Sequence, residues 1–119
     1  MSPRAIVDLV LAHRFKATSE QELQEGLWLT FTTAALGLSL RREVRLSVGE
    51  RIDFLIDDVG VEVKIDGSAA ALMRQAARYL RCDEVRALVV VTTLARHRAL
   101  PADMFGKSVY VAHLEGNAF

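Results

Sequence analysis

The chain has 119 residues, of which 51% are hydrophobic and 25% are charged, and its 15 basic and 15 acidic residues give a formal net charge of zero. This length fits one domain with its own core, and the composition is typical of a folded globular protein. Zero net charge argues against a protein that coats nucleic acid through bulk electrostatics.

Helical and strand patterns alternate along the chain. In chain order we expect helices over residues 4–15 and 19 to about 36, strands over 41–46, 51–57 and 61–66, a helix over 68–81, a strand over 86–93 and, after an irregular stretch with room for a short helix, a strand over 107–114. Ser19 and Glu22 have the spacing of a capping box, and Gly37 is expected to end the second helix. The order ααβββαβ(α)β predicts an α/β domain over residues 1–119, with a central mixed β-sheet flanked by helices.

Two of the expected strands carry charged residues where Val or Ile would make a better sheet. Because side chains alternate along a strand, one face is expected to hold only apolar residues. These are Ile52, Phe54, Ile56, Val61, Val63 and Ile65. The opposite face then receives Asp53, Glu62 and Lys64.

The expected hairpin brings these three charges together. With its turn at Asp58–Val59, Asp53 lies opposite Lys64 and diagonal to Glu62. Two carboxylates can hold a hard divalent cation, and a neighbouring Lys can orient a water and stabilise charge on a phosphate. The alternative is an ordinary polar sheet face with a cross-strand ion pair.

The two helices beside these strands carry polar residues near their apolar stripes. Glu20 falls on the stripe made by Leu23, Leu27, Phe31, Ala34 and Leu38, with Gln24 at its edge. A carboxylate there needs a metal or a basic partner, unless it only favours the helix dipole and reaches solvent. On the later helix, Gln75 and Tyr79 can orient a phosphate or a water, or can be core-edge residues bonded to backbone carbonyls.

Arginine accounts for twelve of the fifteen basic residues, and several cluster in the sequence. Arg offers a rigid fork of donors that suits phosphate oxygens. The expected nucleic-acid-binding residues are Arg42, Arg45, Arg51, Arg74 and Arg78. Solvated surface charge is the alternative for all of them. His13, His97 and His113 lack zinc-ligand spacing and receive no metal role.

The two central strands also carry a family motif. Asp53, eight intervening residues, and then Glu62-Val63-Lys64 on the next strand resembles the signature of the PD-(D/E)XK nuclease superfamily. Ile52 stands where the name-giving Pro would be. The order of one helix, three strands, a helix and a Val-rich strand also resembles that superfamily's core, over about residues 18–92. The resemblance therefore implies a restriction-endonuclease-like fold.

Two further motifs flank this one. "QAARY", Gln75 to Tyr79, resembles the QxxxY motif of the RecB-type branch. "EQELQ", Glu20 to Gln24, is similar to the N-terminal helix motif of VRR-NUC and Holliday-junction-resolvase-like members. The resemblance implies a site for Mg²⁺ or Mn²⁺ whose ligands are Glu20, Asp53, Glu62 and the carbonyl of Val63. It also implies catalytic residues, which are Asp53, Glu62, Lys64, Gln75 and Tyr79.

The sequence therefore predicts a metal-dependent deoxyribonuclease that hydrolyses DNA phosphodiester bonds, with structure-selective cleavage and RNA as a substrate both left open. The alternative is a non-catalytic nucleic-acid-binding or assembly subunit of a DNA-processing or defence complex. Because the chain is close to a minimal core, we expect a homodimer or a larger complex. No stretch has the roughly 18 apolar residues of a membrane span, no export signal is evident, and one Cys, Cys82, allows no internal disulfide, so a cytoplasmic protein is expected.

Overall fold

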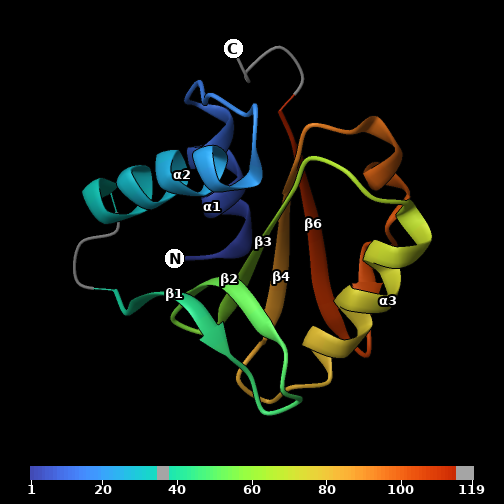
Figure 1. The fold of residues 1–119 in the computed structure, drawn as a ribbon. Helices are drawn as coiled ribbons and strands as arrows, with labels where there is room; N and C mark the ends of the chain where they lie inside the picture. Colours follow the sequence, from blue (N-terminus) through green and yellow to red (C-terminus); the bar gives the residue numbers. More distant parts are fainter. Residues whose placement is uncertain (35–37, 115–119) are drawn as a thin grey trace.

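A computed structural model describes residues 1–34 and 38–114 (Figure 1). Its elements, in chain order, are α1 (Pro3–Leu11), α2 (Glu20–Ala34), β1 (Leu40–Arg45), β2 (Arg51–Ile56), β3 (Val59–Lys64), α3 (Ala69–Leu80), β4 (Ala87–Thr92), the 3₁₀ helix η1 (Ala95–Ala99), β5 (Asp103–Met104) and β6 (Lys107–His113). The predicted order of elements is confirmed, with the two-residue strand β5 added. No helix of these described residues is long and apolar enough to span a membrane.

Within the described residues, six strands form one mixed sheet in the order β1-β2-β3-β4-β6-β5. The first three strands are antiparallel neighbours, and β3, β4 and β6 are parallel to one another. Parallel strands need a crossover, which α3 supplies between β3 and β4. The predicted mixed α/β sheet flanked by helices is therefore confirmed.

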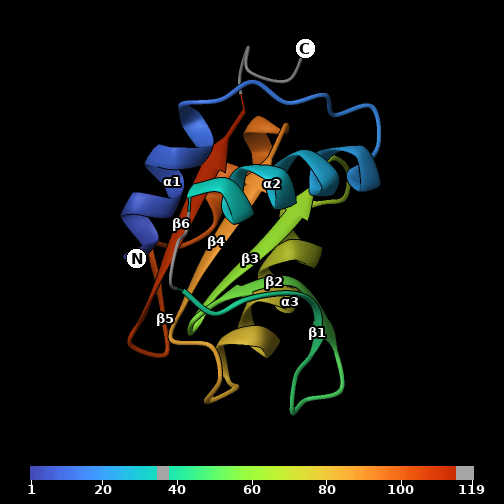
Figure 2. The same ribbon diagram turned by 90° about the vertical axis from the view of Figure 1, so that its left-hand side faces the viewer.

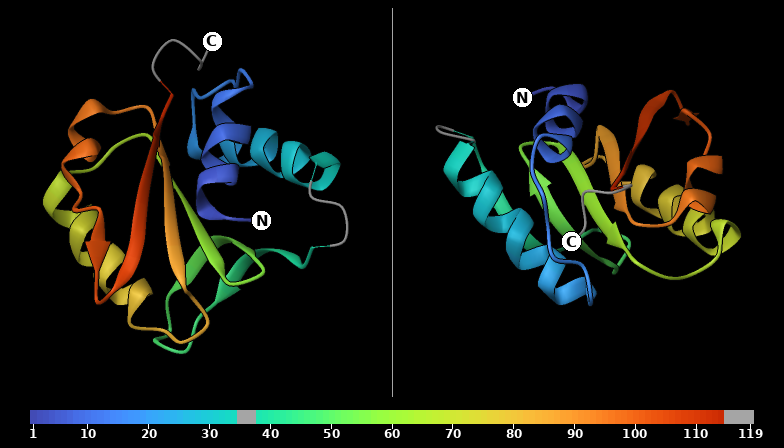
Figure 3. Two further views of the ribbon diagram at one scale, coloured as in Figure 1. Left: turned by 180° about the vertical axis from the view of Figure 1, so that it is seen from behind. Right: turned by 90° about the horizontal axis from the view of Figure 1, so that it is seen from above.

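The helices cover the two faces of the sheet as separate layers. Figures 1 and 2 show α1 and α2 on one face and α3 on the other, and Figure 3 shows the same layers from behind and from above. Each face has its own apolar core. Leu23, Leu27 and Phe31 of α2 pack with α1 on the first face, and Leu72 and Leu80 of α3 pack on the second. Both faces being covered explains why all six residues of β4 are buried.

Local side-chain bonds set the beginnings of the helices. The Ser68 hydroxyl accepts from the Ala71 N–H and caps α3. The Ser19 hydroxyl accepts from the Glu22 N–H, but the Glu22 carboxylate reaches back to Thr18 rather than to Ser19. The capping box is therefore confirmed in one of its two bonds.

The ends of α1 and α2 differ from the expectation. Helix α1 ends at Leu11, four residues early, and the chain then turns so that Phe15 is buried against Gly26 of α2. Helix α2 is described to Ala34, whose side chain is exposed, so its predicted place in the buried stripe is wrong. The predicted stop at Gly37 lies outside the described residues.

The β2–β3 hairpin turns one residue earlier than predicted. Ile56 pairs with Val59, so the turn is Asp57–Asp58, and Asp57 has a positive φ of 51°. Asp tolerates this left-handed conformation better than most residues, and the pattern of apolar residues did not reveal it. The register places Asp53 in line with Glu62, so the predicted opposition of Asp53 and Lys64 is wrong.

The face assigned to Ile52 is also wrong. Phe54 and Ile56 pack on the α1–α2 face, but Ile52 packs in the core under α3. Gly60 makes room for it, because a Cβ on Gly60 would come within 2.5 Å of the Ile52 Cδ1 atom. The regular alternation of β2 is therefore interrupted at Asp53.

Candidate functional site

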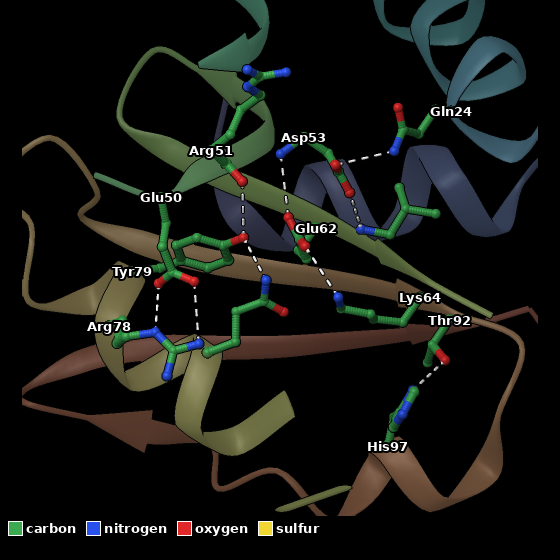
Figure 4. Close-up of polar contacts among 12 residues, drawn as sticks. Gln24, Glu50, Arg51, Asp53, Glu62, Lys64, Arg78, Tyr79, Thr92 and His97 are labelled. Atoms are coloured by element: carbon green, nitrogen blue, oxygen red, sulfur yellow. Dashed lines mark hydrogen bonds and ion pairs between the residues drawn. The ribbon is translucent and has the colours of Figure 1, made fainter. Parts of the chain in front are cut away.

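Asp53 of β2 and Glu62 and Lys64 of β3 converge in one group, here called the acidic cluster, in which Glu62 is buried and the other two are partly buried (Figure 4). The cluster lies where the regular pairing of β2 with β3, which runs from Phe54–Val61 to Ile56–Val59, comes to its end. Although the predicted register was wrong, the predicted convergence of the three charges is therefore found.

The two carboxylates bridge the strands beyond that point. The Asp53 N–H donates to Glu62 Oε1 at 3.2 Å, and the Val63 N–H donates to Asp53 Oδ2 at 2.7 Å. Lys64 Nζ lies 3.4 Å from Glu62 Oε2. These bonds satisfy the backbone, and a neutral amide oxygen would accept the same two bonds, although it would make them weaker. Burying two like charges is costly, so the charges call for a reason beyond holding the strands.

Charge in the acidic cluster is unbalanced when both of its carboxyl groups are ionised. Glu62 is 4% exposed, and two carboxylates share one neighbouring Lys. Burial, followed by repulsion from Asp53, raises the pKa of Glu62 to about 8. Burial also raises the pKa of Asp53, against the opposing effects of the Val63 N–H and Lys64. Near neutral pH the pair therefore holds less than its full charge of −2, and a cation would restore it.

Helix α2 brings Gln24 and Glu20 toward the acidic cluster. Gln24 Nε2 donates to Asp53 Oδ1 at 3.0 Å, a bond that the sequence did not predict. Glu20 is half-buried, and burial raises the pKa of its carboxyl, which Lys64 lowers and Asp53 raises. The charges of the acidic cluster therefore act on the Glu20 carboxyl, and its role as a metal ligand stays a prediction.

On the other face, α3 places Tyr79 beside Glu62. The Tyr79 side chain is buried, and burial followed by the charge of Glu62 raises the pKa of its hydroxyl. The hydroxyl donates to the backbone carbonyl of Arg51 at 3.1 Å and accepts from Gln75 Nε2 at 2.9 Å. The bond to a backbone carbonyl agrees with the interpretation of Tyr79 as a residue at the edge of the core. Its position beside Glu62 agrees with the interpretation that it supports the site.

The acidic cluster has the chemistry of a divalent-cation site without a complete ligand set. Its carboxylate oxygens suit Mg²⁺ or Mn²⁺, and its unbalanced charge is what a cation would offset. Among the described residues, however, no group of three or more His, Cys, Asp or Glu side chains is arranged to hold a metal. Asp53 and Glu62 thus fit as a pair, while Glu20 and the Val63 carbonyl stay predicted ligands.

Three of the five predicted nucleic-acid-binding arginines have partners within the chain. Arg42 contacts Glu25 at 2.8 Å and lies over Trp28, and Arg45 donates to the Gly49 carbonyl. Arg78 donates two hydrogen bonds to Glu50, at 2.6 and 3.1 Å. Arg51 and Arg74 are exposed. Their role in binding nucleic acid stays a prediction.

Two hollows lie beside the acidic cluster. One borders α3, and the other borders α2 and β1. The first, of about 230 Å³, is lined by Lys64 of β3, the Asp66–Ser68 loop, and Gln75 and Arg78 of α3. The second, of about 520 Å³ and more open, is lined by Gln24, Arg42 and neighbours from α2 and β1. Lys64 and Gln24, which each bond a carboxylate of the cluster, therefore also face these hollows.

A second buried polar group, here called the His97 network, fixes the wall of the first hollow. His97 and Thr92 are fully buried, and His97 Nδ1 lies 2.6 Å from the Thr92 hydroxyl. His97 Nε2 contacts the Gly67 carbonyl at 3.0 Å, so Nε2 carries the proton. Thr92 accepts from the Leu94 N–H and donates to Nδ1, so a neutral His97 satisfies every bond.

No pattern in the sequence singles out His97. It stands between two arginines, Arg96 and Arg98, in the stretch that is expected to be irregular with room for a short helix. Arg96 donates to the same Gly67 carbonyl at 2.8 Å. Because Gly67 lies about thirty residues earlier in the chain, local pattern does not reveal this contact.

Comparison of the chain with protein-family models, with curated proteins and with solved structures found no significant match to any of them.

Proposed function

We propose that this protein is a metal-dependent nuclease that hydrolyses phosphodiester bonds of DNA and has a PD-(D/E)XK, restriction-endonuclease-like core. One observation carries the proposal. Glu62 is buried and Asp53, on the adjacent strand, is partly buried; among the described residues the ion pair of this group is with Lys64, and an amide in place of either carboxylate would still accept the same backbone bonds. Burying unbalanced charge is costly, and such groups gather at functional sites.

The order of elements also supports the proposal. The motif residues lie on the expected elements: Gln24 on α2, Asp53 on β2, Glu62 and Lys64 on β3, and Tyr79 on α3. Helix, three strands, helix and buried strand follow one another as in the superfamily core that the sequence resembles.

The residues of the site divide the chemistry among them. A divalent cation held by Asp53 and Glu62 supplies positive charge to the phosphate and lets water act as a nucleophile near neutral pH. Lys64, at the edge of the hollow, orients the attacking water and stabilises charge on the phosphate. Gln24 holds the Asp53 carboxylate in place, and Tyr79, bonded to the Arg51 carbonyl, lies beside Glu62 on the α3 side.

A second candidate is a binding or assembly protein with the same fold and no catalysis. The observation that favours it is the incomplete set of metal ligands among the described residues, together with the internal pairing of Arg42 and Arg78. Under this alternative the carboxylates serve only to join β2 to β3.

Cleavage of labelled duplex, single-stranded, flap and four-way-junction DNA and of supercoiled plasmid, with Mg²⁺ or Mn²⁺, separates the two candidates. The wild type is compared with two variants. Asp53→Asn preserves the shape of the Asp53 side chain, and Lys64→Met preserves the apolar stem of the Lys64 side chain. Metal-dependent cutting that both substitutions abolish is expected. If the folded wild type is as inert as both variants on every substrate, the catalytic proposal fails for this chain.

A further inference from the structure

The hollow beside Lys64 contains an arginine whose hydrogen-bonding fork is occupied. Arg78 lines this hollow together with Lys64, Gln75 and Asp66. Its guanidinium donates from Nε and from a terminal nitrogen to the two oxygens of Glu50, at 2.6 and 3.1 Å. Figure 4 shows this pair beside Tyr79. A carboxylate in this two-point contact occupies the atoms that would otherwise bind two oxygens of a phosphate.

The pair lies next to the candidate site. Glu50 and Arg78 immediately precede Arg51 and Tyr79, whose carbonyl and hydroxyl are joined by a 3.1 Å hydrogen bond. Tyr79 in turn is close enough to Glu62 to shift its pKa. An anion bound to Arg78 would therefore lie alongside the acidic cluster, on the α3 side of it.

Glu50 and Arg78 are accessible enough for an anion to compete with Glu50. The side chains of Arg78 and Glu50 are 48% and 29% exposed, so water and salt screen their attraction. A two-point contact is stronger than most exposed ion pairs, but solvent screening keeps its strength modest. A polyanion, by contrast, gains from every phosphate that it places on a basic group.

We propose that this hollow is a phosphate subsite for the nucleic-acid strand next to the cleaved bond, with Arg78 as its anion-binding group and Glu50 as a built-in competitor for Arg78. The inference rests on the proposed function for the identity of the ligand. It explains why a predicted nucleic-acid-binding arginine is bonded to a carboxylate, and it makes Glu50 a determinant of substrate affinity.

The test measures binding of a fluorescently labelled DNA duplex by anisotropy, with every variant made in an Asp53→Asn background so that no DNA is cut. Glu50→Gln should tighten binding by about three- to fivefold, since it removes an exposed pair of modest strength. The gain should disappear in the double variant with Arg78→Gln. Free inorganic phosphate is added as a competitor. If it weakens DNA binding by the Glu50→Gln variant, single phosphates also occupy the subsite. If it does not, the subsite binds only the phosphates of a nucleic-acid strand.

Asp58→Asn is the matched control. Asp58 forms the same kind of exposed pair, with Arg86 at 2.9 Å, and its replacement changes the net charge by the same amount. Asp58 follows β2 at the hairpin turn, whereas Lys64 ends β3, so about 20 Å of strand separates the control from the hollow. Binding by this variant should change by less than about twofold, as expected for a remote exposed charge.

Four results overturn the inference: no gain with Glu50→Gln, an equal gain with Asp58→Asn, a gain that persists without Arg78, or no DNA binding by any variant. Cleavage by the wild type is scored separately. If the wild type cuts DNA but Glu50→Gln does not tighten binding, the proposed function stands and the phosphate subsite is wrong. If Glu50→Gln tightens binding but the wild type does not cut DNA, the phosphate subsite stands and the proposed catalytic function is wrong.

Discussion

The acidic cluster and the His97 network are both buried polar groups at the same end of the sheet, but their electrostatics differ. In the His97 network, an imidazole, a hydroxyl and a carbonyl bond to one another, and the network contains no carboxylate. In the acidic cluster the hydrogen bonds are also made, but two carboxylates face one ammonium group. Buried polarity alone therefore does not distinguish the two groups, whereas the balance of charge does.

This difference assigns the two groups separate tasks. The His97 network ties η1 and the end of β4 to the loop before α3, which forms a wall of the hollow beside Lys64. It is expected to contribute stability. The acidic cluster is expected to cost stability and to contribute chemistry, as is common for sites that bind charged ligands. Substitutions in the two groups should therefore have opposite effects on stability.

The largest effect is expected for Asp53→Asn. The amide keeps the shape and an acceptor for the Val63 N–H, but it removes the charge that holds a cation. Cleavage of DNA should fall by at least about 100-fold, the usual cost of losing one element of electrostatic stabilisation. Circular dichroism should show an unchanged fold. Asp58→Asn at the exposed turn is the control, and comparable activity in both variants would contradict the assignment.

The next largest effect is on stability as a function of pH. Because the pKa of Glu62 rises from an ordinary 4.5 to about 8 on folding, the folded state holds the extra proton between these values. Stability should therefore fall as the pH rises from about 4.5 through 8. Glu62→Gln removes this loss. Above pH 8 the free energy of unfolding of the variant, measured by urea denaturation, should exceed that of the wild type by on the order of a few kcal/mol. A wild type whose stability rises over this range would refute the account.

His97→Ala should act in the opposite direction. It removes one hydrogen-bond partner from the Thr92 hydroxyl and one from the Gly67 carbonyl, which keep their bonds to Leu94 and Arg96, and it opens a cavity, so the free energy of unfolding should fall by about 1–3 kcal/mol. Urea denaturation followed by fluorescence measures this. The affinity for Mn²⁺ should stay within about twofold of wild type, because His97 is not a ligand. A large loss of Mn²⁺ affinity with unchanged stability would reverse the roles of the two groups.

The smallest effect is expected for Gln24→Ala. Gln24 touches Asp53 Oδ1 and so orients one carboxylate without adding charge. Removing it should weaken Mn²⁺ binding by about tenfold, the lower end of the effect of losing a residue that orients a ligand. Calorimetric titration measures the change, and Gln21→Ala, on an exposed position of the same helix, provides the control. Equal affinities in both variants would show that Gln24 has only a structural role.

The order of elements was predictable because period and capping residues act locally. The Val-rich run of β4 and the Ser68 cap of α3 each follow from a few neighbouring residues. The hairpin register was not predictable in this way, because the left-handed Asp57 moves the turn without leaving a mark on the apolar pattern. Gly60 was the one available sign that Ile52 lies on the α3 face, since Gly within a strand often marks a close approach.

Some residues of the candidate site were also predictable from local sequence, and others were not. Asp53, Glu62 and Lys64 were found because each interrupts an apolar strand. The contacts of Gln24 with Asp53, of Glu50 with Arg78 and of His97 with Gly67 join residues about thirty positions apart. Such contacts follow from how the layers pack. For that reason, the spacing of residues along the chain predicts the members of the acidic cluster but not the residues that support it.

Asp53 and Glu62 are proposed to form a cation site whose charge is completed by metal. Calorimetric titration of the wild type with Mn²⁺ at pH 7, in buffers of different ionisation enthalpy, tests it directly. Because the pKa of Glu62 is about 8 without metal, binding should release roughly one proton at pH 7 and almost none at pH 10, and Glu62→Gln should abolish the release. If Mn²⁺ does not bind the folded protein, or binds it without releasing a proton and equally in Glu62→Gln, the acidic cluster is not the cation site.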